Sequence, residues 1–85
     1  MGQTTICMDY DDTYTKAPEL MEMIISKSKA LGYRIILCTM RCEDEEDMYI
    51  ASLRDKFDAV YFTSRMAKKP YLEMFNEYPD IWIDD

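Results

Sequence analysis

Histidine is absent from the 85 residues of this sequence, and cysteine occurs only three times. Without an imidazole, the chain lacks the base on which many serine and cysteine hydrolases rely, so acid–base chemistry falls to aspartate, glutamate, lysine or tyrosine. Cys7, Cys38 and Cys42 are odd in number and include no C-x-x-C pair, which argues against a disulfide framework and against a zinc site. They predict reduced thiols in a cytoplasmic protein.

Positive charge is scarce, and long apolar runs are missing. Ten lysines and arginines oppose seventeen aspartates and glutamates, for a net charge of −7, so the chain lacks the basic face that binding to extended nucleic acid requires. The charge of any phosphorylated ligand must therefore be balanced within the binding site, by a metal ion or by a few lysine or arginine side chains. No segment approaches the roughly 18 apolar residues of a membrane span, and the N-terminus lacks a signal-peptide pattern. We therefore expect neither nucleic acid nor a membrane as a partner.

Hydrophobic residues are nonetheless plentiful, at 48% of the chain beside 32% charged residues. This is enough apolar matter for a core, and the length suits one small domain, which we expect over residues 1–85. Seven tyrosines are hard to bury in so small a domain. Partial exposure of Tyr49, Tyr71 and Tyr78, and self-association into a homo-oligomer, are further expectations.

Apolar runs and helical periodicities alternate along the chain. Four short apolar runs that end at polar residues predict strands at Thr4–Met8, Arg34–Thr39, Asp58–Thr63 and Ile81–Ile83. Three segments with apolar residues at helical spacing predict helices at Pro18–Leu31, Glu43–Phe57 and Pro70–Tyr78.

The ends of the predicted helices carry further signals. Pro18 suits a first helical turn, and Gly32 suits the position just past a helix end. The second predicted helix starts with five consecutive acids from Glu43 and ends among Arg54 and Lys56. Acids first and bases last complement the helix dipole.

Alternating strands and helices predict an α/β fold: a four-stranded parallel sheet covered on both faces, in a three-layer Rossmann-like sandwich. Polar residues at the strand ends, Asp9, Thr39, Thr63 and Asp84, then gather at one edge of the sheet. Ligands of open α/β sheets bind at this edge, where the strand order reverses. With a strand order of 3-2-1-4, Asp11 also converges there with Asp9 and Asp84.

Carboxylates that converge in this way repel one another unless a counter-charge joins them. A hard divalent cation meets this need, and oxygen ligands beside a substrate phosphate suit Mg²⁺. A side-chain carboxylate can also attack phosphorus and form a covalent phosphoryl intermediate. A second carboxylate two residues further on could then handle the proton.

Four segments in order resemble the motifs of the haloacid dehalogenase superfamily of phosphotransferases. Ile6–Thr13 is similar to its first motif, an apolar strand followed by D-x-D-x-T, and Ile35–Thr39 is similar to its second, an apolar strand ending in Thr or Ser. Lys69-Pro70 resembles the third, a lysine at the start of the helix before the last core strand. Ile81–Asp85 resembles the fourth, an apolar strand ending in an acidic pair.

The resemblance implies a role for each matching residue. Asp9 would be the nucleophile that forms an aspartyl-phosphate, and Asp11 would protonate the leaving oxygen and then activate water. Thr39 would hydrogen-bond the phosphoryl oxygens, and Lys69 would neutralise charge on the intermediate.

The resemblance also implies a metal site and an open substrate site. Mg²⁺ would be held by Asp9, the backbone carbonyl of Asp11, Asp84 and Asp85. No segment is long enough for a cap domain, so substrate selection would fall to short loops. Substrate-binding residues are then expected at Thr13, Arg41 and Lys68, and Lys68 and Lys69 compete for the role of the motif lysine.

The leading hypothesis is therefore a Mg²⁺-dependent phosphatase or nucleotidase acting on a small phosphoester or nucleotide. The lack of a cap and the stop at the acidic pair keep a second hypothesis open, in which the protein binds or sequesters a phosphorylated ligand with little or no turnover. A third is a phospho-accepting receiver domain. It is disfavoured because the third predicted strand ends in Thr63-Ser64, with no acceptor aspartate.

Overall fold

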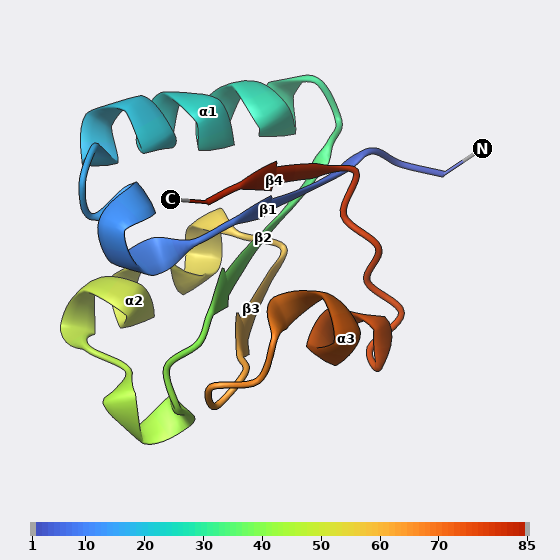
Figure 1. The fold of residues 1–85 in the computed structure, drawn as a ribbon. Helices are drawn as coiled ribbons and strands as arrows, with labels where there is room; N and C mark the ends of the chain where they lie inside the picture. Colours follow the sequence, from blue (N-terminus) through green and yellow to red (C-terminus); the bar gives the residue numbers. More distant parts are fainter. Residues whose placement is uncertain (1, 85) are drawn as a thin grey trace.

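Four parallel strands form the centre of the structure, a computed structural model that describes residues 2–84 (Figure 1). The strands are β1 (Thr5–Met8), β2 (Arg34–Thr39), β3 (Ala59–Phe62) and β4 (Ile81–Ile83). Their order in the sheet is β3-β2-β1-β4, and every pairing is parallel. The predicted strand order is thus confirmed, and it makes β1 and β2 the central strands.

The two central strands are almost fully buried because they are apolar on both faces. Ile35, Ile36, Leu37 and Cys38 of β2 are inaccessible to solvent. This continuous apolar run matches a strand that is covered on both sides. The shorter β4 lies at the edge, paired with β1 from Ile6↔Ile81 to Met8↔Ile83, and is more exposed.

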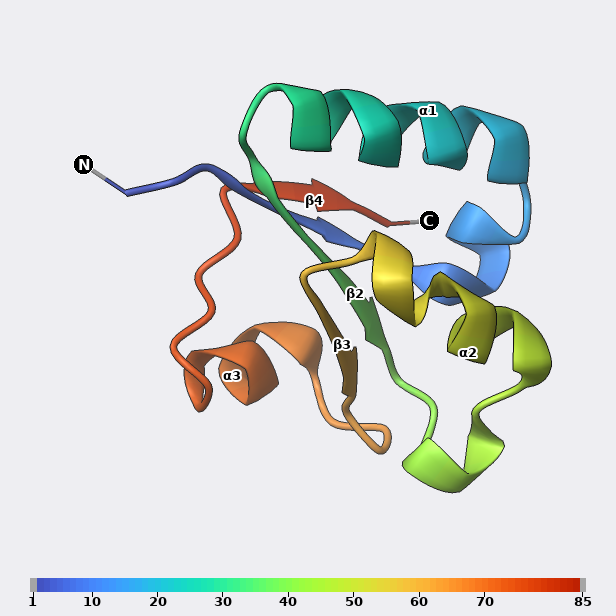
Figure 2. The same ribbon diagram turned by 180° about the vertical axis from the view of Figure 1, so that it is seen from behind.

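Helices pack on the two faces of the sheet (Figures 1 and 2). They are α1 (Pro18–Ala30), α2 (Met48–Leu53) and α3 (Lys68–Glu73). Side chains from α1 and α2 join Ile6, Met8 and Leu37 in the larger core cluster. Leu72 of α3 joins Cys7, Ile36 and Cys38 in a smaller cluster, so neighbouring strand residues face opposite sides, as the period of two requires.

The predicted helix Glu43–Phe57 is wrong as a single element. Glu43–Glu45 form one tight turn, α2 spans only Met48–Leu53, and Arg54–Lys56 form a second tight turn. Asp47, expected inside the first helical turn, is instead the N-cap of α2, and its side chain accepts a hydrogen bond from the Ile50 N–H at 2.8 Å. A capping aspartate sets the helix start, so the acids before it lie outside the helix.

The third helix also differs from its predicted range of Pro70–Tyr78. It begins two residues earlier, at Lys68, and ends at Glu73. The earlier start places both lysines in the first helical turn. Pro70 is accommodated there because the first N–H groups of a helix have no partner within the helix.

The first helix follows its prediction closely and ends before Gly32. Gly32 adopts a φ of +78°, the left-handed conformation that glycine takes at the end of a helix without steric cost.

None of the helices among residues 2–84 is long and apolar enough to cross a membrane. On the surface, Tyr49 and Tyr78 are 69% and 62% exposed, as expected, while Tyr71 is half-buried. Self-association remains a prediction.

Candidate functional site

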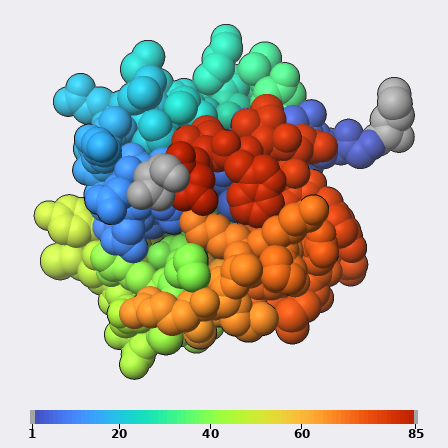
Figure 3. Space-filling view, viewed as in Figure 1, coloured from blue at the N-terminus to red at the C-terminus, as the bar shows by residue number. Residues whose placement is uncertain are grey.

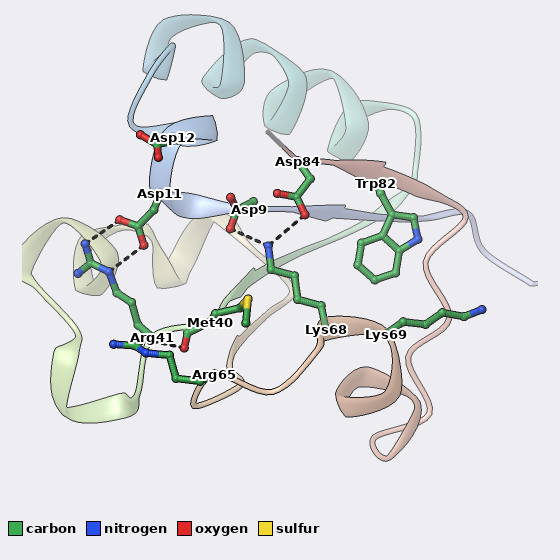
Figure 4. A pocket seen from close by; sticks show the side chains of 10 residues that line it. All are labelled: Asp9, Asp11, Asp12, Met40, Arg41, Arg65, Lys68, Lys69, Trp82 and Asp84. Atoms are coloured by element: carbon green, nitrogen blue, oxygen red, sulfur yellow. Dashed lines mark hydrogen bonds and ion pairs between the residues drawn. The ribbon is translucent and has the colours of Figure 1, made fainter.

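The loops that follow the strands surround a pocket at the carboxyl edge of the sheet. It has a volume of about 670 Å³ and opens on the face seen in Figure 3, where the blue, green, orange and red segments meet. Its wall consists of Asp9, Asp11, Asp12, Met40, Arg41, Arg65, Lys68, Lys69, Trp82 and Asp84 (Figure 4). Most of the residues singled out from the sequence are therefore brought together.

The pairing of β1 with β4 brings the first and last acidic groups together. Met8 lies opposite Ile83, and the Asp9 N–H donates a hydrogen bond of 2.9 Å to the Ile83 carbonyl. Asp9 and Asp84 therefore leave adjacent strands at the same level. Their convergence follows from the strand order, since the order 3-2-1-4 makes β1 and β4 neighbours.

Lys68 connects these two carboxylates. Its Nζ lies 2.7 Å from Asp9 Oδ1 and 3.3 Å from Asp84 Oδ2, and only 11% of the lysine side chain is exposed. Burial lowers the pKa of Lys68, but the hydrogen bond and charge of Asp9, together with the charge of Asp84, outweigh this effect, and the net pKa is raised. The ammonium is therefore firmly charged at neutral pH.

Asp9 is the most enclosed of the pocket carboxylates. Burial raises its pKa, while the Lys68 ammonium acts in the opposite direction, and the net pKa lies above its usual range. Its second oxygen, Oδ2, accepts a hydrogen bond of 3.3 Å from the Thr13 hydroxyl. Thr13, expected to bind substrate, is buried and instead orients Asp9.

A short turn over Tyr10–Tyr14 presents two further acidic residues, Asp11 and Asp12, to the pocket. It is closed by a hydrogen bond of 3.1 Å from the Thr15 N–H to the Tyr10 carbonyl. Asp12 within it has a φ of 62°, a left-handed conformation that aspartate tolerates better than most residues.

Arg41 holds the carboxylate of Asp11. The guanidinium donates from Nη2 to Asp11 Oδ1 at 2.8 Å and from Nε to Asp11 Oδ2 at 3.0 Å, a bidentate arrangement. It also donates to Asp47 Oδ2 at 3.2 Å and lies over the Tyr10 ring, 5.2 Å from its centroid. Arg41, expected to bind substrate, lines the pocket but contacts the proposed acid–base residue.

The two lysines at the start of α3 differ in orientation, and of the two candidates left open by the sequence only Lys68 points to the carboxylates. Lys68, and not Lys69, contacts the carboxylates; the Lys69 side chain lies at the pocket wall but extends away from Asp9 and Asp84 (Figure 4). The contacts expected of the motif lysine at Lys69 are therefore made by Lys68. The phase of a helix that starts at Lys68 explains this, since successive residues point in directions about 100° apart.

Thr39 is also placed differently from its expected role. It is 1% exposed, does not line the pocket, and its hydroxyl accepts a hydrogen bond of 3.3 Å from the Arg41 N–H. It supports the loop that carries Met40 and Arg41 into the wall. Asp85, expected as a metal ligand, lies outside the described residues.

The loop that leads into α3 is held in a strained conformation. Ser64 and Arg65 have φ values of 54° and 72°, which non-glycine residues adopt rarely. Their N–H groups donate to the Arg41 and Met40 carbonyls at 3.2 and 2.8 Å. These bonds fix the loop before α3 to the loop after β2, and so hold Lys68 in place against Asp9.

Sequence reasoning assigned no role at the site to Asp47 or to Trp82. Asp47 helps to orient Arg41, which no short motif could indicate because the contact depends on the break between the tight turn and α2. Trp82 lines the pocket two residues before Asp84. Here a signal was present, since residues i and i+2 of a strand point to the same face.

Comparison of the chain with family models, with curated proteins and with solved structures finds no match. The site offers a buried, hydrogen-bonded carboxylate, a charged lysine beside it, and three further carboxylates in an open pocket. The pocket has a size that suits a small molecule.

Proposed function

We propose that this protein is a Mg²⁺-dependent phosphohydrolase of the haloacid dehalogenase type, built on a three-layer Rossmann-like sandwich. The observation that carries the proposal is the meeting of Asp9 and Asp84 on the Lys68 ammonium in a pocket at the carboxyl edge of the sheet. It supports the ordered resemblance of the four sequence segments.

The donor set of the pocket fits Mg²⁺. Asp9 and Asp84 bring two negative charges against the single charge of the Lys68 ammonium that contacts both, so this group of three has a net negative charge that a cation would balance. Carboxylate oxygens are the ligands that Mg²⁺ prefers. Asp9, Asp84 and the Asp11 carbonyl would hold the ion. When bound, Mg²⁺ supplies charge neutralisation to the transferring phosphoryl group.

The side chains divide the reaction into two steps. A carboxylate oxygen of Asp9 attacks phosphorus and displaces the ester oxygen, which takes a proton as it leaves. The product of this step is an aspartyl-phosphate, and attack by water then releases inorganic phosphate and restores Asp9. Lys68 stabilises the negative charge that develops next to Asp9 in both steps.

Asp11 is the proposed source and acceptor of the proton. Both of its oxygens are engaged by Arg41 in this structure, so the ion pair must separate when substrate binds. The guanidinium released in this way would be available to phosphoryl oxygens, for which its geometry is suited.

The same ion pair favours a second candidate function. If Asp11 stays bound to Arg41 in the presence of ligand, the proton transfer cannot occur, and the pocket would bind a phosphorylated molecule without turning it over. Phosphate release measures turnover, and ligand-induced thermal stabilisation measures binding, so the two functions can be distinguished.

The test is release of phosphate from an aryl phosphate and from a panel of mononucleotides, with Mg²⁺ and with a chelator. We expect Mg²⁺-dependent release that Asp9→Asn lowers by at least about a thousandfold, as expected when a nucleophile is removed. Asp12→Asn is the matched control, because Asp12 also lines the pocket and asparagine tolerates its left-handed backbone. Equal activity of wild type and Asp9→Asn would refute the mechanism, and ligand-induced thermal stabilisation without release would favour the binding function.

A further inference from the structure

Trp82 presents an aromatic surface inside the proposed site. It is 39% exposed and lines the same pocket as Asp9 and Asp84. Burial of a large aromatic side chain is favourable. A ligand that covers the indole in this pocket would therefore gain binding free energy from the contact.

The position of Trp82 in the sheet explains why it is uncovered. It lies opposite Cys7 in the register of β1 and β4, and Cys7 belongs to the cluster that Leu72 of α3 covers. Trp82 therefore lies on the α3 side of the sheet, at the edge strand. The helix covers the central strands and leaves this edge open to the pocket.

Trp82 is also placed at a fixed distance from the reacting groups. It shares a strand face with Asp84, two residues further on, which corresponds to about 6.6 Å along the strand. In Figure 4 the indole lies beside the Lys68 side chain, on the side opposite Met40. A molecule with its phosphoryl group at Asp9 and Lys68 would thus pass over the indole if it extended toward β4.

We propose that Trp82 is the specificity-determining residue of the site and that the substrate is a nucleoside monophosphate, whose base stacks on the indole. This inference rests on the proposed phosphohydrolase function. Stacking on an aromatic side chain tolerates any base, because every base has a π-face.

The geometry favours a nucleotide over a simple aryl phosphate. An aryl ester carries its ring directly on the phosphoryl oxygen, whereas the ring site at Trp82 is offset along β4 from Asp84. A nucleotide has a sugar between phosphate and base, which spans this offset. The pocket volume of about 670 Å³ also suits a ligand of nucleotide size better than a phenyl ester.

The first test is binding, and it uses Trp82 as the reporter. The sequence contains one tryptophan, so its fluorescence reports on this side chain alone. In the Asp9→Asn variant with Mg²⁺, we expect adenosine monophosphate to quench the fluorescence saturably and inorganic phosphate to reverse the effect. Ribose 5-phosphate should bind without this quenching. No saturable quenching by the nucleotide would overturn the assignment.

The second test is kinetic and separates the ring site from the reaction itself. We expect Trp82→Ala to lower kcat/KM for adenosine monophosphate by about 5- to 100-fold, mainly through KM, while kcat/KM for ribose 5-phosphate changes by less than about twofold. Trp82→Phe should restore most of the loss, because it keeps an aromatic face. An equal loss on both substrates would mark Trp82 as structural, and a larger loss on phenyl phosphate than on the nucleotide would refute the nucleotide assignment.

The two proposals fail in different ways. Saturable quenching without hydrolysis of any substrate would refute the phosphohydrolase and leave the base-stacking site intact. Hydrolysis that depends on Asp9 but not on Trp82 would refute the base-stacking site and leave the phosphohydrolase intact.

Discussion

At the scale of single residues, one lysine joins the two carboxylates that follow β1 and β4. Lys68 Nζ contacts Asp9 and Asp84 at 2.7 and 3.3 Å and is almost fully enclosed. Its neighbour Lys69 belongs to the same helical turn and lines the same pocket but points elsewhere. Variants of the two lysines therefore compare a charge that contacts Asp9 and Asp84 with a charge that points away from them.

We expect Lys68→Met to lower kcat/KM for an aryl phosphate by about 100-fold, since a charged donor at the site of developing negative charge is lost while the aliphatic stem is kept. Lys69→Met should change it by less than about threefold. The measurement is steady-state phosphate release, with thermal unfolding to verify that both variants fold. A loss confined to Lys69→Met would reverse the assignment.

The choice between these lysines shows where sequence reasoning stops. The sequence indicates a lysine near the start of the last helix, but which one faces Asp9 depends on the residue at which the helix begins. Likewise, the roles of Thr13 and Arg41 depend on contacts with Asp9 and Asp11 that no spacing reveals. The acids themselves, Asp9 and Asp84, were predictable because each directly follows a short apolar strand.

At the scale of elements, the strands were more predictable than the helices. The run Ile35–Cys38 is apolar without interruption, and a run this short, rich in β-branched residues, is typical of a buried strand. The acids Glu43–Asp47 complement a helix dipole, but aspartate is also a preferred N-cap. The capping role prevails here, because Asp47 caps α2. Two of the preceding acids pair with arginines, Glu45 with Arg65 at 2.9 Å and Glu46 with Arg54 at 2.6 Å.

The end of α1 offers a test at this scale. Gly32 has a φ of +78°, and a Cβ added there would meet no atom within 4 Å. Gly32→Ala should therefore lower the free energy of unfolding by about 1 kcal/mol through backbone strain alone, or the melting temperature by about 4–8 °C. Gly2→Ala, which also meets no neighbour and lacks the positive φ, should be neutral. Equal melting temperatures for the two variants would contradict this account.

At the scale of the whole molecule, a buried ion pair ties the connection before β4 to the sheet. Glu77 is 6% exposed and accepts hydrogen bonds from Arg34 of β2 at 2.6 and 3.1 Å and from the Tyr61 hydroxyl of β3 at 2.6 Å. Burial raises the pKa of Glu77, but these hydrogen bonds outweigh it, and the net pKa is lowered. The same contact and burial raise the pKa of Tyr61 to about 12.

The lowered pKa gives the molecule a defined sensitivity to acid. The stability that Glu77 contributes is complete above its unfolded pKa of 4.5 and is lost as the pH falls through its lower folded value. We expect Glu77→Gln to cost about 1–3 kcal/mol at about pH 7 and the difference from wild type to shrink by about pH 3. Urea unfolding at both pH values measures this, with the exposed Glu73→Gln as control. A difference that does not depend on pH would rule out the ion pair as its source.

The position of β4 has a consequence for how the protein acquires its site during synthesis. Asp9 is synthesised well before Asp84 and the strand that aligns it, and the two residues meet through the pairing between β1 and β4. A nascent chain that stops short of β4 can form β1, β2 and their helix but not the complete pocket. The complete pocket thus forms only once β4 has docked against β1, and we expect a nascent chain without β4 not to bind the ligand.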